Sequence, residues 1–211
     1  MRIVFTCGGT GGHINPALAV AKLVRARRPE SAILFVGAKG GMEEELVARE
    51  GFAIETVEIS NFRRSFKPRD LRNNVRTLGL IRRSVRRAGD ILDAFGADIV
   101  VGTGGYASFP VVRAAQKRGL PTVIHESNAS PGLTTVMLAK KATRVLVSFE
   151  ESAGRYPHPD RVRVTGTPVR QEFVFLGQAE EKAKLGMDGQ KLIVSYWGSL
   201  GAREMNKKIA D

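Results

Sequence analysis

The 211-residue sequence predicts an α/β fold with a doubly wound parallel sheet. Short runs of β-branched residues alternate with segments of helical periodicity, which is typical of consecutive βαβ units with right-handed crossovers. Three predicted strands are followed directly by glycine-rich or polar loops, and ligands of such sheets bind outside the carboxyl ends of the strands. Strands are expected at residues 3–6, 33–36, 56–59, 98–101, 122–124 and 145–148.

Helices are expected between these strands, at residues 16–27, 43–50 and 109–117. The first helix is predicted to start at Pro16, because Asn15 suits the N-cap and proline suits the first helical position. A further helix follows from apolar residues at spacings of three and four, a stripe that favours burial in the core. The stripe consists of Leu71, Val75, Leu78, Ile81, Val85, Ala88 and Leu92.

The loop of residues 8–13, Gly-Gly-Thr-Gly-Gly-His, is the most informative motif. Glycines let backbone N–H groups approach an anionic ligand closely, and a following helix presents the positive end of its dipole there. The pattern therefore predicts a phosphate site. His13 lies at the mouth of this loop, where an imidazole can take or give a proton near neutral pH or serve only as a hydrogen-bonded spacer.

Two other loops are expected at the same edge of the sheet. Residues 102–106 place the phenol of Tyr106 beside glycines, either as a ligand contact or as the surface residue of a tight turn. His125 and Glu126 could bind sugar hydroxyls, relay a proton or form a structural pair. Strand alternation predicts that at most one of the two points at a ligand. Asn128, just before a helix-start signature, can be read as a turn residue.

The charge is strongly uneven, with ten basic residues and one acid between residues 63 and 87 and a net charge of +12 for the chain. A localised positive surface favours a polyanionic partner, either nucleic acid or an anionic membrane leaflet. Phe66 and Leu80 lie among these arginines off the apolar stripe, which favours a membrane surface over a purely solvated basic face. The predicted membrane-surface residues are Phe66, Arg72, Arg76, Leu80, Arg82 and Arg83.

Several classes of protein are disfavoured. Cys7 is the only cysteine, so a disulfide framework and a thiolate metal site are excluded and a reducing compartment is expected. A nicotinamide-dependent oxidoreductase remains an alternative, but Ile14 stands where the dinucleotide fingerprint requires its third glycine. A basic nucleic-acid-binding module is a second alternative, although the aromatic residues of the region form no stacking array.

Five motifs occur in order along the chain, and together they resemble the MurG family of peptidoglycan glycosyltransferases. They are the loop of residues 8–13, Gly104-Gly105-Tyr106, His125-Glu126-Ser127-Asn128, the segment of residues 165–170 and Gly198-Ser199-Leu200-Gly201-Ala202. The family pattern has glutamine at Ser127, asparagine at Thr167 and commonly glycine at Trp197. The bulk of Trp197 puts the geometry of the loop beside it in doubt.

The resemblance implies a GT-B fold and an inverting, metal-independent transfer of N-acetylglucosamine from UDP-N-acetylglucosamine to undecaprenyl-diphospho-muramoyl-pentapeptide, with no cofactor. It implies His13, Tyr106, His125 and Glu126 on the acceptor side. The acceptor hydroxyl needs a base, for which His13 is the first candidate and Glu126 the second. The donor-binding residues that it implies are Thr10, Gly11, Gly12, Asn128, Arg170 and Ser199. A peripheral location on the cytoplasmic face of the plasma membrane follows, with lipid and not nucleic acid as the polyanion.

Two domains are expected, an amino-terminal acceptor domain of residues 1–163 and the start of a donor-binding domain in residues 164–211. The second stretch contains an apolar strand at residues 192–195 and the start of a helix, which is too little to bury a core of its own. We therefore expect a truncated protein that does not bind donor normally and is inactive alone.

Overall fold

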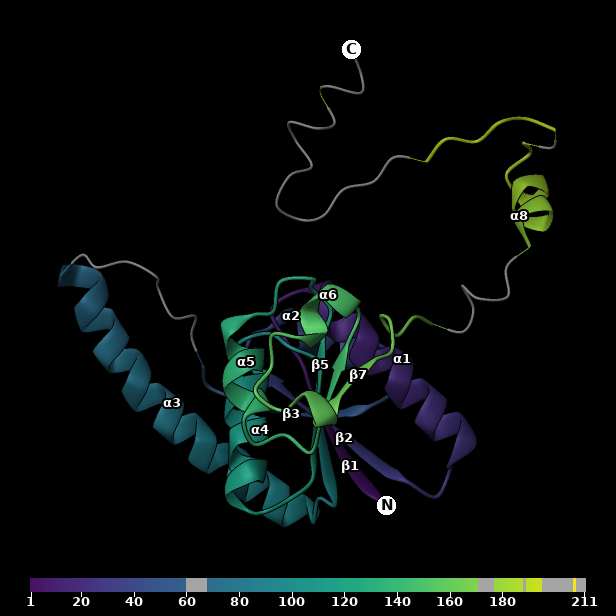
Figure 1. The fold of residues 1–211 in the computed structure, drawn as a ribbon. Helices are drawn as coiled ribbons and strands as arrows, with labels where there is room; N and C mark the ends of the chain where they lie inside the picture. The colour runs from purple at the N-terminus through teal and green to yellow at the C-terminus, as the bar shows by residue number, and fades with distance from the viewer. Residues whose placement is uncertain (60–67, 171–176, 188, 195–206, 208–211) are drawn as a thin grey trace. The chain divides into compact units, whose positions relative to one another are not determined.

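The computed structural model describes residues 1–59, 68–170, 177–187, 189–194 and 207, with the side chains of residues 68–78 left out. The chain divides into a unit of residues 1–171 and a unit of residues 172–211 (Figure 1). Residues 164–170, which the sequence reading assigned to the second domain, belong to the first unit, where the N–H of Thr165 donates to the carbonyl of Val147 at 2.9 Å.

The described part of the first unit contains a seven-stranded parallel sheet in the order β3-β2-β1-β4-β5-β6-β7. Its strands are β1 (Arg2–Thr6), β2 (Ala32–Ala38), β3 (Ala53–Val57), β4 (Ile99–Gly102), β5 (Thr122–Glu126), β6 (Arg144–Val147) and β7 (Val162–Val164). The strand order reverses between β1 and β4, which is where ligands of doubly wound sheets bind. The predicted fold class is confirmed, and β7 is an addition that the sequence reading missed.

Helices cover both faces of the sheet (Figure 1). Alternation along β1 divides the core, because Ile3 and Phe5 pack with one buried cluster while Val4 packs with the other. The first cluster lies under α1 (Gly11–Arg27) and α2 (Met42–Arg49), and the second lies under α3 (Pro68–Phe95), α4 (Ser108–Lys117) and α5 (Leu133–Ala139). Two short elements, α6 (Glu150–Ala153) and the 3₁₀-helix Pro159–Arg161, precede β7.

The start of α1 corrects one expectation. The helix begins at Gly11 with Thr10 as its N-cap, and Pro16 lies inside it. The Thr10 carbonyl accepts the N–H of His13 at 3.0 Å and the N–H of Ile14 at 3.2 Å, so the first helical turn is built from the glycines themselves. A single proline in the second turn removes one donor without ending the helix. His13 therefore lies in the first turn of α1, and not in a loop that precedes it.

The described half of α3 confirms the predicted stripe. Val85, Ala88 and Leu92 are buried and Ile81 is partly buried against the same core, whereas the side chains of Leu71, Val75 and Leu78 lie outside the description. In the second unit, α8 (Gln178–Lys184) has no buried residue.

The strand expected at residues 192–195 is wrong for its described residues. Residues 192–194 form no strand, and Ile193 is 90% exposed. An apolar run needs neighbouring strands to bury it, and no described strand pairs with this segment.

Candidate active site at the carboxyl edge of the sheet

The turn from β1 into α1 presents unpaired backbone donors. Among the described contacts, the N–H groups of Gly11 and Gly12 have no acceptor, as expected for the first positions of a helix. Thr10 and Gly12 are exposed and Gly11 is half-buried, so these donors face solvent at the positive end of the helix dipole. An anion such as a phosphate fits this place.

His13 lies beside these donors, and its ring is held at one nitrogen. Its Nδ1 is 3.2 Å from the Gly8 carbonyl oxygen and 3.3 Å from the Thr10 hydroxyl. A carbonyl can only accept, so the contact with Gly8 favours the neutral tautomer with the proton on Nδ1. That tautomer leaves the lone pair on Nε2, which has no hydrogen-bond partner among the described residues. The half-buried imidazole can accept a proton there.

The turn between β4 and α4 packs onto the first loop. A Cβ at Gly104 would lie 2.7 Å from Cδ2 of His13, and one at Gly105, where φ is +81°, would lie 2.0 Å from the Gly8 carbonyl oxygen. Only glycine fits this close approach. The Thr103 hydroxyl donates to the His13 carbonyl at 2.6 Å. The structure therefore brings the first two predicted loops together.

Tyr106 lies at the same junction. Its half-buried ring packs against Gly9, where a Cβ would lie 3.0 Å from Cε1 of the ring. The two loops that the sequence predicts at the same edge of the sheet therefore meet in space, and the Tyr106 ring borders exposed Gly9.

His125 lies further along the edge and is 3% exposed. Its Nε2 is 3.1 Å from the Gly166 carbonyl and 3.4 Å from the Ser148 hydroxyl, and its Nδ1 is 3.4 Å from the Ser127 hydroxyl. Burial lowers the pKa of His125, although the Gly166 carbonyl and the Glu126 carboxylate partly oppose the shift. The neutral imidazole thus links β5 to the segment around Gly166, which follows β7.

Glu126 is 4% exposed and holds the loop that follows β5. Its Oε1 accepts the backbone N–H of Asn128 at 3.0 Å and the side-chain amide of Asn128 at 2.7 Å, and its Oε2 accepts the N–H of Gly132 at 2.9 Å. Burial raises the pKa of Glu126, but the hydrogen bonds from Thr135, Gly132 and Asn128 outweigh it and lower the pKa overall. The carboxylate is therefore engaged, while exposed Asn128 is oriented by it.

Arg170 and Ser199 are the remaining residues of the implied donor set. Arg170 lies 3.9 Å from Glu50, which follows the C-terminal end of α2, whereas the glycine-rich loop meets the N-terminal end of α2. A hydrogen bond from Lys22 is the main cause that lowers the pKa of Glu50, and the charge of Arg170 contributes. Ser199 lies outside the described residues.

Glu43 is a residue that the sequence reading missed. Its carboxylate is fully buried and accepts the N–H of Ala38 at 2.7 Å and the N–H of Gly9 at 3.4 Å. The sequence does not predict this burial, because Glu43 begins a run of three acidic residues that is typical of an exposed first helical turn.

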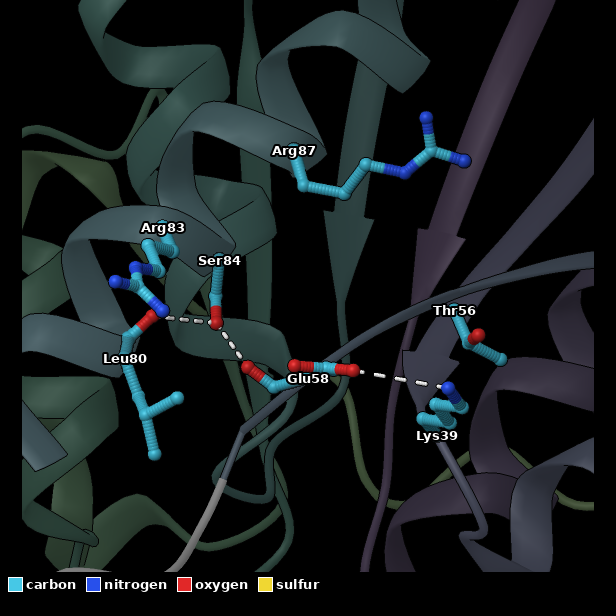
Figure 2. A pocket seen from close by; sticks show the side chains of 7 residues that line it. All are labelled: Lys39, Thr56, Glu58, Leu80, Arg83, Ser84 and Arg87. Atoms are coloured by element: carbon cyan, nitrogen blue, oxygen red, sulfur yellow. Dashed lines mark hydrogen bonds and ion pairs between the residues drawn. The ribbon is translucent and has the colours of Figure 1, made fainter.

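The described part of the basic segment shows exposed arginines on α3. Arg82, Arg83 and Arg86 are exposed, whereas Leu80, which the sequence predicts as an apolar residue exposed among arginines, is half-buried. Leu80 lines a hollow of about 330 Å³ between α3 and the ends of β2 and β3, and Figure 2 shows the side chains around it. The Ser84 hydroxyl lies within hydrogen-bond distance of the Leu80 and Glu58 carbonyls and donates its one proton to either of them (Figure 2). Lys39 pairs with Glu58 at 3.6 Å. Phe66 lies outside the described residues, as do the side chains of Arg72 and Arg76.

No described helix is long and apolar enough to cross a membrane. The same residues contain no group of three or more His, Cys, Asp and Glu side chains that could hold a metal ion.

The fold and the site together define a Rossmann-like domain with a glycine-rich turn, and a helix N-terminus open to solvent, after its first strand. Residues 3–147 match the glycosyltransferase family 28 N-terminal domain, and the chain belongs to this family. Together with the curated relatives and the solved structure described next, this match confirms the resemblance to the MurG family.

Curated relatives align with the whole chain. A protein of Ruminiclostridium cellulolyticum is 40% identical over all of this chain and 57% of its own length, and one of Bacillus subtilis strain 168 is 38% identical with the same coverage. Both are described as UDP-N-acetylglucosamine--N-acetylmuramyl-(pentapeptide) pyrophosphoryl-undecaprenol N-acetylglucosamine transferase. The chain thus spans somewhat more than half the length of these relatives.

Solved structures agree with the fold. The crystal structure of Acinetobacter baumannii MurG has a TM-score of 0.63 at 28% identity and covers 81% of this chain and 46% of its own. Anabaena Alr3699/HepE in complex with UDP and glucose has a TM-score of 0.55 at 17% identity, with 88% of this chain and 50% of that chain covered, and supports the fold alone.

Proposed function

We propose that this chain supplies the acceptor-side part of an inverting glycosyltransferase in peptidoglycan synthesis. The reaction moves N-acetylglucosamine from UDP-N-acetylglucosamine to undecaprenyl-diphospho-muramoyl-pentapeptide. One observation carries the proposal: the N–H groups of Gly11 and Gly12, which have no acceptor among the described residues, lie beside an imidazole whose Nδ1 contacts the Gly8 carbonyl. The printed descriptions of the relatives supply the substrates.

His13 acts as the base in this proposal. The acceptor hydroxyl must lose its proton as it attacks the anomeric carbon, and Nε2 of His13 has a lone pair available for it. Glu126 is the weaker candidate, because its carboxylate is buried and already accepts three N–H groups. We therefore assign Glu126 to holding Asn128, and His125 to orienting the segment near Gly166.

The leaving diphosphate needs charge stabilisation more than protonation, because UDP is already a weak base. The helix N-terminus formed by Thr10, Gly11 and Gly12 supplies N–H donors and a positive dipole end for this purpose without a metal ion. Asn128, Arg170 and Ser199 complete the proposed donor contacts by resemblance, and Tyr106 stands on the acceptor side. This half of the proposal rests on the motif order alone.

The exposed arginines of α3 support peripheral binding to an anionic membrane, as a lipid-linked acceptor requires. Arg82, Arg83 and Arg86 are exposed on one helix, and each basic residue near an anionic leaflet contributes about 1 kcal/mol. We propose the cytoplasmic face of the plasma membrane as the location. A general polyanion surface that binds nucleic acid equally well is the competing interpretation.

Transfer can be tested in a chimera in which residues 1–211 replace the matching part of the Bacillus subtilis relative. We expect transfer of labelled N-acetylglucosamine to a short-chain lipid acceptor, with no dependence on added divalent metal. The native relative serves as the positive control, and circular dichroism shows whether the chimera is folded. A folded chimera that binds UDP-N-acetylglucosamine but never modifies the acceptor would contradict the proposal.

A further inference from the structure

The buried carboxylate of Glu43 is not used by the mechanism above. It is 0% exposed, and its oxygens accept the N–H of Ala38 at 2.7 Å and the N–H of Gly9 at 3.4 Å. Burying a carboxylate is costly unless hydrogen bonds satisfy it, and an apolar side chain could fill the same space without that cost. The charge therefore calls for an explanation beyond packing.

Glycines from three segments create the space that this carboxylate fills. A Cβ at Gly8 would lie 2.5 Å from Oε1 of Glu43, one at Gly37 would lie 2.4 Å from its Cγ, and one at Gly41 would lie 2.6 Å from its Cδ. No real Cβ approaches that closely, so any side chain at these positions displaces Glu43. The end of β1, the end of β2 and the start of α2 thus converge on one carboxylate.

One peptide group connects Glu43 to His13. The N–H of Gly9 and the carbonyl of Gly8 belong to the same planar unit and point in opposite directions. The N–H donates to Oε2 of Glu43, while the carbonyl oxygen lies 3.2 Å from Nδ1 of His13. A peptide group between two glycines is less restrained than any other, and Gly9 has a φ of +86°. The orientation of the Gly8–Gly9 peptide group therefore depends on the hydrogen bonds that it makes.

We propose that Glu43 is a positioning residue for His13, acting through the Gly8–Gly9 peptide. The carboxylate holds the N–H of Gly9, which directs the Gly8 carbonyl at Nδ1 of His13 and fixes the proton there. Hydrogen bonds in such a chain polarise one another, so the carbonyl also becomes a stronger partner for the charged imidazolium. The lone pair of His13 is thereby kept on Nε2. The positioning of His13 stands on the contacts alone, and only its effect on the rate of transfer rests on the proposed function.

The proposal can be tested by nitrogen NMR of the imidazoles and by amide exchange in the 211-residue chain itself. In the parent, we expect the His13 ring in the Nδ1–H tautomer and a Gly9 amide that exchanges slowly. Fast exchange at Gly9 or an Nε2–H tautomer in the folded parent would overturn the proposal without any variant.

Glu43→Gln is the main variant. Its amide oxygen can still accept the N–H of Ala38, but its NH₂ group then faces the N–H of Gly9, so two donors meet without an acceptor. We expect exchange at Gly9 to accelerate about tenfold or more beyond any change at core amides, as the loss of a hydrogen bond to a charged group implies. The tautomer of His13 becomes mixed. Glu45→Gln is the matched control, since exposed Glu45 on the same helix pairs only with Arg49 among the described residues, and neither signal should change.

Gly37→Ala is a second route to the same result, because its Cβ displaces the carboxylate without removing the charge. It should reproduce both NMR changes, and unchanged Gly9 exchange and His13 tautomer in both folded variants would refute the positioning role. In the chimera, Glu43→Gln should lower kcat by about tenfold to hundredfold with little change in KM. An inactive parent chimera would count against the proposed function alone, because the NMR signals do not depend on transfer.

Discussion

Glu126→Gln tests directly how the loop after β5 is held. The carboxylate accepts three N–H groups, two from Asn128 and one from Gly132, at 2.7–3.0 Å. In the variant, the new NH₂ group must face at least one of these donors and leave it without an acceptor. A hydrogen bond to a charged group contributes about 1.5–3 kcal/mol, so we expect the free energy of unfolding at pH 7 to fall by about 2 kcal/mol. For a unit of this size, that corresponds to a melting temperature lower by roughly 4–8 °C.

The pH dependence of this loss has a definite sign. The folded pKa of Glu126 lies below the ordinary 4.5, because its hydrogen bonds outweigh the effect of burial. Such a group stabilises the fold above its unfolded pKa and loses that contribution as the pH falls through its folded pKa. The difference between parent and variant should be full at pH 7 and shrink as the pH falls below 4.5.

The assay is unfolding by urea and by heat, followed by circular dichroism from pH 7 down to the lowest pH at which the parent is folded. Glu151→Gln is the control, because Glu151 is an exposed glutamate on α6. A loss at pH 7 within about 0.5 kcal/mol, the range of ordinary surface substitutions, would refute the reasoning. A loss of equal size at every pH would refute the electrostatic part of it.

Two further predictions concern the loop junction and the basic face. Gly105→Ala should lower the free energy of unfolding by about 1–3 kcal/mol more than Gly119→Ala does. Both glycines have positive φ, but only a Cβ at Gly105 would meet the Gly8 carbonyl. Equal losses in the two variants would contradict the close approach. Replacing Arg82, Arg83 and Arg86 by serine should weaken co-sedimentation with anionic vesicles roughly hundredfold in low salt, and Leu80→Ser should weaken it less since Leu80 is half-buried. Efficient competition by DNA would instead indicate a general polyanion surface.

The sheet and its loops were predictable because their signals are local. β-branched runs mark the strands, and glycine-rich turns mark the points where β1 and β4 end, so two predicted loops meet around His13 as expected. The start of α1 was mispredicted because proline and an N-cap residue favour Pro16 statistically, whereas the Thr10 carbonyl closes the first turn around the glycines.

Glu43 could not be predicted because its role depends on three glycines that the fold brings together from separate segments. Its neighbours in the sequence are acidic, a pattern that normally indicates a solvated helix start. Glu126 shows the same limit, since spacing cannot reveal that its oxygens are occupied by Asn128 and Gly132. Burial and partner choice are properties of the packed structure and not of local periodicity.

The central claim is that His13 is the base of a transfer reaction, and the kinetics of His13→Ala in the chimera test it most directly. We expect kcat to fall by roughly 10² or more while KM for the lipid acceptor changes little, because a lost base affects the transition state and not ground-state binding. The Nδ1 contact with Gly8 supports this expectation, since it leaves Nε2 free. An unchanged kcat with a raised KM would contradict the claim and reduce His13 to a binding residue.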